Sequence, residues 1–499
     1  MTKGIKIVSK TNANDIEKFA VNEMAEYLKA ITNKQIDIVN FTSDHSIYIG
    51  CFPHNAENIL SELNGLDDDN FIIKNIRDNI VIYGKTARGT LYGVYDYLNR
   101  LGVRFYFPGK ENEFIPKVDD VFIKNINVKE SPTFNHRSVV LYYWEDGFDN
   151  WIDFSAKTKL SAIHLHSDDG IYEMAENVKS RGLDFNVRRH FFGEKYAKDD
   201  KNFLEENKAL VKDYVNNLPN QINEFFLWPA DVTLGLYDNP DNWSIPDVIL
   251  KFTNDMSTAI REVRPNARMS FLSYWSTWGI PNKIKPIDSV FLEIAHIHQC
   301  FSHYIADPLC PVNSKEVADI IDNLLEIFNP LETHVLGYWL DASLFGRGVY
   351  QDLSGRLPNT GSIIQKDLIY YKNKGVKNIS TFAVDLNKNY FQRFASPNVF
   401  LYPMLLWNVN IDIEQELENF CINFYGNRDI AKFFQYTEQI DPRHKDTEQW
   451  NSIKQHLSHS ETIINDIIKG TTKDIHILRL NRLLDEIHHI CKWIDKTMA

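Results

Sequence analysis

Eight short apolar segments, separated by stretches with helical periodicity, occupy residues 130 to 410 and constrain the fold more than any other feature of the chain. Strands that alternate with helical patterns are typical of a parallel sheet with crossover helices. Eight such units favour a closed (β/α)8 barrel over a doubly wound sheet, which usually has fewer strands and a glycine-rich phosphate turn. The eight segments are RSVVLYY (137–143), SAIHLH (161–166), LDFNVRR (183–189), EFFLWP (224–229), RMSFLSYW (268–275), SVFLEIAHI (289–297), HVLGYWL (334–340) and ISTFAV (379–384).

One smaller part is expected before the barrel and another after it. Before it, strand and helix patterns alternate and include FIIKNIRDNIVIYGK (71–85), which predicts two strands joined by a polar turn. After it, the pattern is helical throughout and favours a small bundle. We therefore predict an α/β domain over 1–128, the barrel over 129–410 and a helical region over 411–499.

Charge and hydropathy exclude several classes of partner. The net charge of −13, without a basic cluster, opposes binding to a phosphate backbone, so no nucleic-acid partner is expected. No segment approaches the roughly 18 apolar residues of a membrane span, and no apolar leader follows the first residues MTKGIKIVSK. We expect a cytoplasmic protein, or a secreted or periplasmic one if a leader has been removed.

Cysteine and aromatic content bear on cofactors and substrates. Five cysteines are scattered without Cys-x-x-Cys spacing, which argues against a disulfide framework. The chain has 10 Trp, 23 Tyr and 31 Phe residues, and aromatic rings suit the C–H faces of sugars. We expect a glycan partner, no cofactor and no bound metal, and the sequence leaves a homodimer open.

The segment from Asp69 to Gly109 carries a family resemblance. It contains Arg-Gly-x-Leu-Tyr-Gly-Val-Tyr at 88–95 and Gly-Val-Arg at 102–104. This pattern resembles the N-terminal α/β domain that precedes the barrel in α-glucuronidases and β-hexosaminidases. The resemblance implies a structural module that contributes no catalytic residue.

The barrel segment resembles the domain of unknown function 4838, part of which is classified as glycoside hydrolase family 163, endo-β-N-acetylglucosaminidases acting on N-glycans. The resemblance implies a bacterial β-N-acetylglucosaminidase-type hydrolase. Two departures are that Asp385 ends strand eight where such proteins usually have Glu, and that the paired Asp-Glu of β-hexosaminidases is missing after strand four. The residues that carry the resemblance are 228–231, Tyr274, 295–300, 307–310, 406–407 and 424–426.

Carboxylates at the carboxyl ends of barrel strands are the candidates for catalysis, because barrel active sites lie there and glycosidases use two carboxyl groups. Asp231, Asp341 and Asp385 follow strands four, seven and eight. We assign Asp231 as general acid/base, Asp341 as nucleophile of a retaining mechanism and Asp385 as the reserve. The alternative is that each Asp only caps the following helix. Glu293 lies early in its strand and is expected to form a structural ion pair.

Strand alternation gives further expectations. Gly337, Trp339 and Asp341 should share one face, as should Thr381, Ala383 and Asp385, so that small residues lie beneath the carboxylates. The apolar run 225–229 should raise the pKa of Asp231, whereas Asp341 should stay ionised.

Histidine and aromatic side chains near strand ends are the candidates for substrate binding. The pairs His164/His166 and His296/His298 place two rings on one face, which suits sugar hydroxyls or, as an alternative, a metal. A turn at 168–170, Asp-Asp-Gly, is a weaker candidate. The predicted substrate-binding residues are Arg188, His190, Trp228, Tyr274, Trp275, His296, His298, Tyr338 and Trp339.

Three other functions stay open at this point: an α-glucuronidase-like glycosidase, a metal-dependent hydrolase in which the histidine pairs and Asp385 hold ions that activate water, and a glycan-binding protein without activity.

Overall fold

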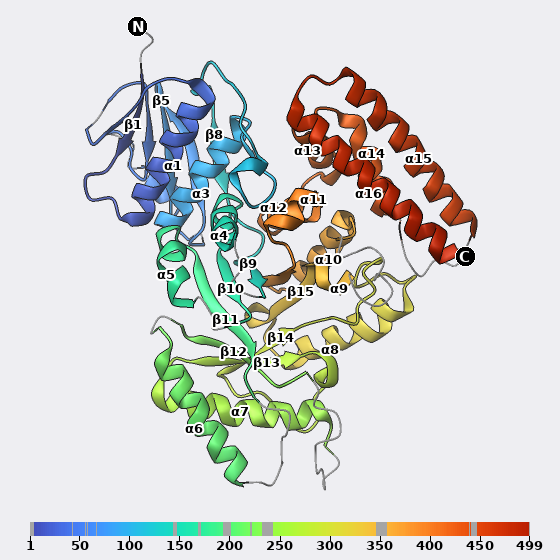
Figure 1. Cartoon of the computed structure of the whole chain (residues 1–499). Coiled ribbons are helices and arrows are strands. Elements are labelled where there is room, and N and C mark those ends of the chain that lie inside the picture. The colour runs from blue at the N-terminus through green and yellow to red at the C-terminus, as the bar shows by residue number, and fades with distance from the viewer. Residues whose placement is uncertain are drawn as a thin grey trace.

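The chain folds into a (β/α)8 barrel with a smaller α/β domain before it and a group of helices after it, which confirms the fold class predicted from the sequence (Figure 1). The computed structural model describes residues 4–41, 43–54, 56, 58–65, 67–142, 147–167, 171–192, 201–219, 222–231, 243–345, 357–438, 440 and 447–498.

The N-terminal domain, blue in Figure 1, is a six-stranded sheet in the order β2-β1-β3-β5-β4-β8. The predicted hairpin at 71–85 forms β4 and β5, which pair antiparallel. Helices α1 and α3 pack on the sheet, and Asn14 begins α1 with a capping box. The predicted boundary at 128 falls within β8, and the domain boundaries stay predictions. The elements are β1 (Ile5–Ser9), α1 (Asp15–Thr32), β2 (Ile36–Val39), β3 (Ser46–Ile49), α2 (Asn58–Glu62), β4 (Phe71–Ile76), β5 (Asn79–Gly84), α3 (Ala87–Arg100), β6 (Arg104–Phe105), β7 (Glu113–Phe114) and β8 (Asn127–Glu130).

The Arg-Gly-x-Leu-Tyr-Gly motif of α3 joins this domain to the barrel. Arg88 Nε lies 2.6 Å from Asp69 Oδ1, and the barrel residue Arg137 donates to Asp69 Oδ2 at 2.7 Å. The Tyr92 hydroxyl donates to the main-chain oxygen of Leu160 at 2.6 Å. These contacts hold the N-terminal domain against the barrel, which agrees with the structural role that the resemblance implied.

The barrel contains all eight predicted strands, which are parallel and close in the order β10-β11-β12-β13-β14-β15-β16-β9. Its strands are β9 (His136–Leu141), β10 (Ala162–Leu165), β11 (Asp184–His190), β12 (Glu224–Trp228), β13 (Arg268–Ser273), β14 (Val290–Ile294), β15 (His334–Asp341) and β16 (Asn378–Val384). The helices that follow them are α4 (Phe148–Lys157), α5 (Ile171–Ser180), α6 (Lys201–Asn217), α7 (Ile245–Val263), α8 (Asp319–Ile327), preceded by a π-helix over Val312–Ala318, α9 (Ala342–Phe345), α10 (Gly361–Asn373), α11 (Lys388–Arg393) and α12 (Asn398–Trp407).

The C-terminal helices, red in Figure 1, pack beside the barrel and also reach the N-terminal domain. Tyr106 of that domain makes edge contacts with Phe400 and Phe420, and its hydroxyl oxygen accepts a hydrogen bond from Asn423 at 2.9 Å. These contacts tie the three parts of the chain together. Among the described residues, no helix is both long and apolar enough to cross a membrane. The helices are α13 (Ile413–Tyr425), α14 (Ala431–Glu438), α15 (Thr447–Gly470) and α16 (Asp474–Met498).

Candidate active site

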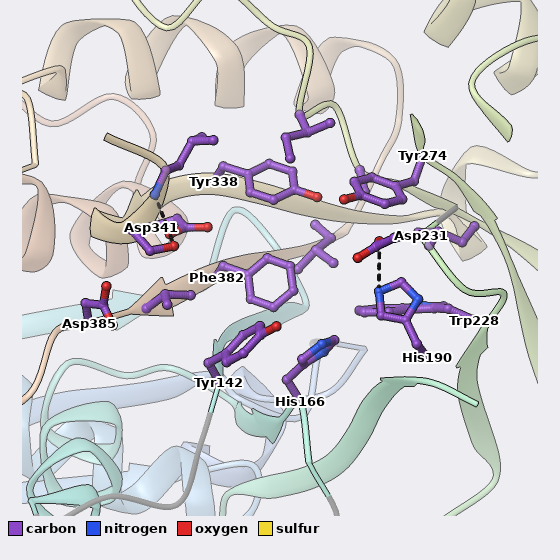
Figure 2. A pocket seen from close by; sticks show the side chains of 17 residues that line it. Tyr142, His166, His190, Trp228, Asp231, Tyr274, Tyr338, Asp341, Phe382 and Asp385 are labelled. Carbon is purple, nitrogen blue, oxygen red and sulfur yellow. Dashed lines mark hydrogen bonds and ion pairs between the residues drawn. The ribbon is translucent and has the colours of Figure 1, made fainter. Parts of the chain in front are cut away.

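A cavity of about 280 Å³ opens at the carboxyl ends of the barrel strands (Figure 2). All three candidate carboxylates line it: Asp231 three residues after β12, Asp341 at the end of β15 and Asp385 directly after β16. Barrel enzymes carry their catalytic groups at this end. The other described residues that line the cavity are Tyr142, His166, His190, Trp228, Leu272, Tyr274, Ala295, Ile297, Leu336, Tyr338, Ser343, Leu344, Phe382 and Val384.

Strand β15 does not follow the simple alternation that the sequence predicted. Tyr338, rather than Trp339, lines the cavity, and the pairing with β16 shifts register between Gly337 and Leu340. Such an irregularity resets which side chains point inward, so Asp341 also faces the cavity. Gly337 and Trp339 do share one face, as expected, but it is the face away from the cavity, and the expectation that Asp341 shares it is wrong.

Strand β16 requires a similar correction. Phe382 and Val384 line the cavity, whereas Thr381 and Ala383 do not belong to its lining. Asp385 reaches the cavity because its backbone is left-handed, with φ of 60°, which turns the side chain out of the strand's alternation. Asp tolerates this conformation better than most residues do. The small residues Thr381 and Ala383 that were expected to lie beneath the carboxylate are therefore not part of the cavity lining.

Asp231 is held by polar partners and not by an apolar wall. Its side chain is 60% exposed, Oδ1 lies 3.2 Å from His190 Nε2, and the Tyr274 hydroxyl donates to it. His190 Nδ1 donates to the Pro229 carbonyl at 2.5 Å, so Nε2 of the neutral ring carries no proton. The contact between Nε2 and Asp231 is a hydrogen bond when one of these two groups carries an additional proton. The burial expected for Asp231 from the apolar run before it is not found.

Asp341 is the buried carboxyl group of the site, with 8% of its surface exposed. Burial raises the pKa of Asp341 above its ordinary value, and the negative charge of Asp385 adds to the rise, although hydrogen bonds from Ser343 and Leu344 oppose it. The raised pKa is opposite in direction to the one expected for a nucleophile, and it makes Asp341 rather than Asp231 the carboxyl group that ionises less readily than a free Asp. Oδ1 accepts from the Leu344 amide at 3.0 Å, so Asp341 also caps α9 as the alternative interpretation proposed.

The floor of the cavity contains a buried ion pair. Arg188 Nη1 lies 2.7 Å from Glu293 Oε1, and Glu293 Oε2 accepts a hydrogen bond from Trp228 Nε1 at 2.7 Å. Both charged side chains have no exposed surface. The structural role expected for Glu293 is confirmed. Arg188 does not line the cavity, because this pair holds its guanidinium below it, over the Phe226 ring.

Four other predicted substrate-binding residues lie away from the cavity lining. Trp339 is buried on the outer side of its strand, where its indole donates to Asp367 at 3.0 Å, and His296 is buried against Trp339. Trp275 and His298 stack on each other with ring centroids 4.9 Å apart and do not line the cavity. His190, Trp228, Tyr274 and Tyr338 are brought together as predicted.

Two aromatic residues of the cavity lining, Tyr142 and Phe382, were not considered in the sequence, and His166 was considered only as part of the His164/His166 pair. Tyr142 stacks on His166 at 4.6 Å, and burial lowers the pKa of His166 to about 4, so its ring is neutral at neutral pH. His166 Nδ1 donates to the Arg188 carbonyl at 2.7 Å, which leaves Nε2 as an acceptor. The signal available in the sequence was the position of His166 at the end of strand two.

The two His-x-His pairs do not form a metal centre with Asp385. His164 lies deeper in the barrel against His136, with their Nε2 atoms 2.9 Å apart, whereas His166 lines the cavity. Among the described residues, one group has metal-binding spacing, namely Cys300, His303 and Cys310. The 168–170 turn lies outside the described residues.

The fold is like that of barrel glycoside hydrolases. Residues 237–438 match the domain of unknown function DUF4838, and residues 2–97 match the glycosyl hydrolase family 67 N-terminus. The chain therefore carries a DUF4838 domain and a family 67 N-terminal domain, as the sequence resemblances implied. None of the curated protein sequences compared with the chain matches it.

Solved structures share the fold at low sequence identity. One is a family GH115 4-O-methyl-α-glucuronidase with specificity for decorated arabinogalactans, with a TM-score of 0.64 and 11% identity over 100% of this chain and 72% of that one. Another is a mutant Streptomyces plicatus β-hexosaminidase, with a TM-score of 0.53 and 11% identity over 90% and 93% of the two chains. A GH138 enzyme targeting pectin rhamnogalacturonan II has a TM-score of 0.53 and 10% identity over 99% and 69%.

Proposed function

We propose that the protein is a retaining glycoside hydrolase acting on N-acetylhexosamine-containing glycans. One observation carries the proposal: Asp231, Asp341 and Asp385 surround one aromatic-lined cavity at the carboxyl ends of the barrel strands. Hydrolysis of a glycosidic bond requires one carboxylic acid to protonate the leaving oxygen and one carboxylate to attack the sugar.

The environments of the carboxyl groups support an assignment of roles that reverses the one made from the sequence. Asp341 is buried and its pKa is raised, so it is the group suited to keep a proton and act as the general acid. Asp231 accepts hydrogen bonds from Tyr274 and pairs with His190, contacts that stabilise a negative charge. We assign Asp231 as the nucleophile, and Asp385 as the neighbouring charge that helps Asp341 retain its proton.

The charges around the cavity favour a neutral sugar. The described residues that line it include three carboxyl groups but no Lys or Arg. A glucuronide would bring a further negative charge without a guanidinium or ammonium partner, and unpaired carboxylates are costly in a partly buried site. An N-acetylhexosamine is uncharged, and its ring can stack on Trp228 or Tyr338. The family 67 N-terminal match makes an α-glucuronidase the second candidate.

The test is a panel of 4-nitrophenyl glycosides, including β-N-acetylglucosaminide and α-glucuronide, together with N-glycans. Asp341→Asn should lower turnover of natural glycans about 10²- to 10⁴-fold but spare aryl glycosides, because an activated leaving group hardly needs protonation. Asp231→Asn should lower turnover of both substrate types. Proton NMR of the first-formed anomer tests retention.

Asp255→Asn on the surface of α7 is the matched control and should behave as wild type. If Asp231→Asn spares aryl glycosides instead, the original assignment of the acid is right. Sugar binding without turnover on any substrate in the panel would indicate a glycan-binding protein, and activity abolished by a chelator would favour the metal-dependent alternative.

A further inference from the structure

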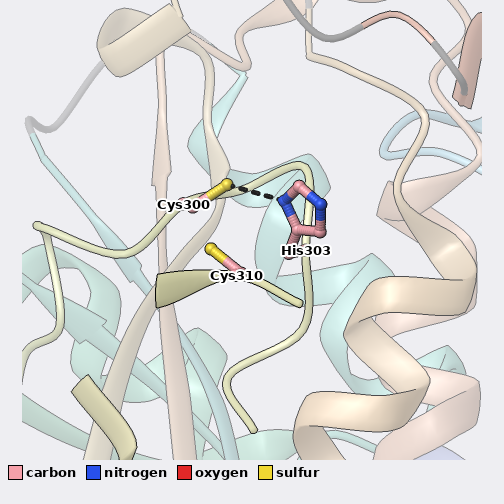
Figure 3. A group of neighbouring side chains, drawn as sticks. All are labelled: Cys300, His303 and Cys310. Carbon is pink, nitrogen blue, oxygen red and sulfur yellow. Dashed lines mark hydrogen bonds between the residues drawn. The ribbon is translucent and has the colours of Figure 1, made fainter. Parts of the chain in front are cut away.

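Three potential metal ligands converge in the segment between β14 and the π-helix, away from the three candidate carboxylates in sequence (Figure 3). Cys300 Sγ lies 3.1 Å from His303 Nδ1, and the ligand atoms of Cys300, His303 and Cys310 all lie within 4.8 Å of one another. Cys300 and Cys310 are buried, and His303 is half-buried. The three side chains thus point toward one common position.

The spacing and the donor set fit a tetrahedral zinc ion. Ligand atoms about 2.0 to 2.3 Å from a common tetrahedral centre lie roughly 3.3 to 3.8 Å apart. This range lies between the 3.1 Å separation of Cys300 Sγ and His303 Nδ1 and the 4.8 Å within which all three ligand atoms lie. Two thiolates and one imidazole are soft and borderline donors, which select zinc over magnesium or calcium. Three protein ligands leave the fourth position for water.

Hydrogen bonds fix the backbone that carries the ligands. The fully buried Asn313 accepts from the Cys300 amide at 2.7 Å and donates to the Cys300 and His303 carbonyls, each at 2.9 Å. The Cys310 amide donates to the Asp307 carbonyl at 3.0 Å. Because the protein forms these hydrogen bonds without a metal ion, the backbone that carries the ligands would need little reorganisation when an ion binds.

We propose that Cys300, His303 and Cys310 bind one Zn²⁺ and that this ion clamps the segment after β14 onto the start of the π-helix. The first residues of that segment, Ala295 and Ile297, line the cavity. The ion therefore supports one wall of the cavity, and its position does not depend on which reaction occurs there.

The experiment is a titration of the full-length, metal-stripped protein with Co²⁺ as a spectroscopic substitute for zinc. Wild type should bind one Co²⁺ per chain, with thiolate-to-cobalt charge transfer in the near ultraviolet and the visible bands of a tetrahedral ion. Loss of groups that only support a metal ligand costs 10- to 100-fold in affinity. Loss of a ligand in His303→Ala or Cys310→Ser should therefore weaken binding by more than about 100-fold.

Cys491→Ser, which removes a half-buried thiol on α16, is the matched control and should bind as wild type. Zinc should also protect Cys300 and Cys310 of the wild-type protein from alkylation while Cys491 still reacts, a measurement that does not depend on the folding of any variant. Octahedral or absent cobalt bands, a Cys300–Cys310 disulfide detected by mass spectrometry in the purified protein, or unchanged binding by Cys310→Ser in a folded variant would each overturn the proposal.

Discussion

Replacing Glu293 by Gln should destabilise the barrel, because it leaves the Arg188 guanidinium charged, fully buried and without its counterion. At a separation of 2.7 Å the pair gains about 6 kcal/mol of attraction with an effective dielectric constant of about 20. Burial opposes this gain, since it raises the pKa of Glu293 and lowers that of Arg188. Removing one partner of such a pair costs about 3 to 5 kcal/mol, which is the loss expected in the free energy of unfolding.

The companion variants separate pairing from packing. Arg188→Met with Glu293→Gln removes both charges and keeps an oxygen that can accept from Trp228, so the double variant should recover most of the loss. Urea unfolding followed by tryptophan fluorescence measures each free energy. If the double variant is as unstable as Glu293→Gln, an unpaired charge is not the cause and the reasoning is refuted.

Arg188→Met alone should have a stability that depends on pH. Without the guanidinium, Glu293 is a buried carboxyl whose folded-state pKa stays above its unfolded value. Such a group contributes stability that is fully present below the unfolded pKa and is lost as pH rises through the folded pKa. The free energy of unfolding of this variant relative to wild type should therefore fall from pH 5 toward pH 8, and an equal difference at both pH values would contradict the argument.

Two further predictions concern the cavity. Turnover should decline as pH rises through the raised pKa of Asp341, which gives the pH profile of kcat an alkaline limb. Asp385→Asn should move this limb to lower pH, because the substitution removes a negative charge that raises the pKa of Asp341. A limb that does not move would contradict the electrostatic coupling between Asp385 and Asp341. Tyr274→Phe should lower kcat/KM about 10- to 100-fold, since a hydrogen bond to a charged group contributes about 1.5 to 3 kcal/mol, and an unchanged value would show that the hydroxyl does not support Asp231.

The sequence predicted the barrel because strand and helix periodicity are local properties. Each of the eight apolar segments became a strand, and the carboxylates that follow strands four, seven and eight came together because parallel strands end at the same rim. Chain order and strand polarity were sufficient for that prediction, and no knowledge of side-chain contacts was needed.

The orientation of individual side chains was not predictable in the same way. The register shift between Gly337 and Leu340 and the left-handed backbone of Asp385 both depend on tertiary pairing, and each changes which residues face the cavity. Arg188 was predicted as a substrate ligand because its ion-pair partner Glu293 could not be identified from the sequence. Glu293 lies three strands away in the barrel. The Cys300, His303 and Cys310 group was missed because its spacing is not Cys-x-x-Cys.

The carboxyl groups on the two sides of the cavity lie in different electrostatic environments. On one side, Asp231 is exposed, accepts a hydrogen bond from Tyr274 and lies 3.2 Å from His190 Nε2. On the other side, burial and the nearby charge of Asp385 raise the pKa of Asp341 above its ordinary value. The Arg188–Glu293 pair beneath is neutral overall, so it does not cancel this difference. A site in which one acid protonates the leaving oxygen while a carboxylate attacks the sugar requires two carboxyl groups with different pKa values. Because all three groups here are aspartates, the difference arises from their burial and their hydrogen-bonding partners and not from residue type.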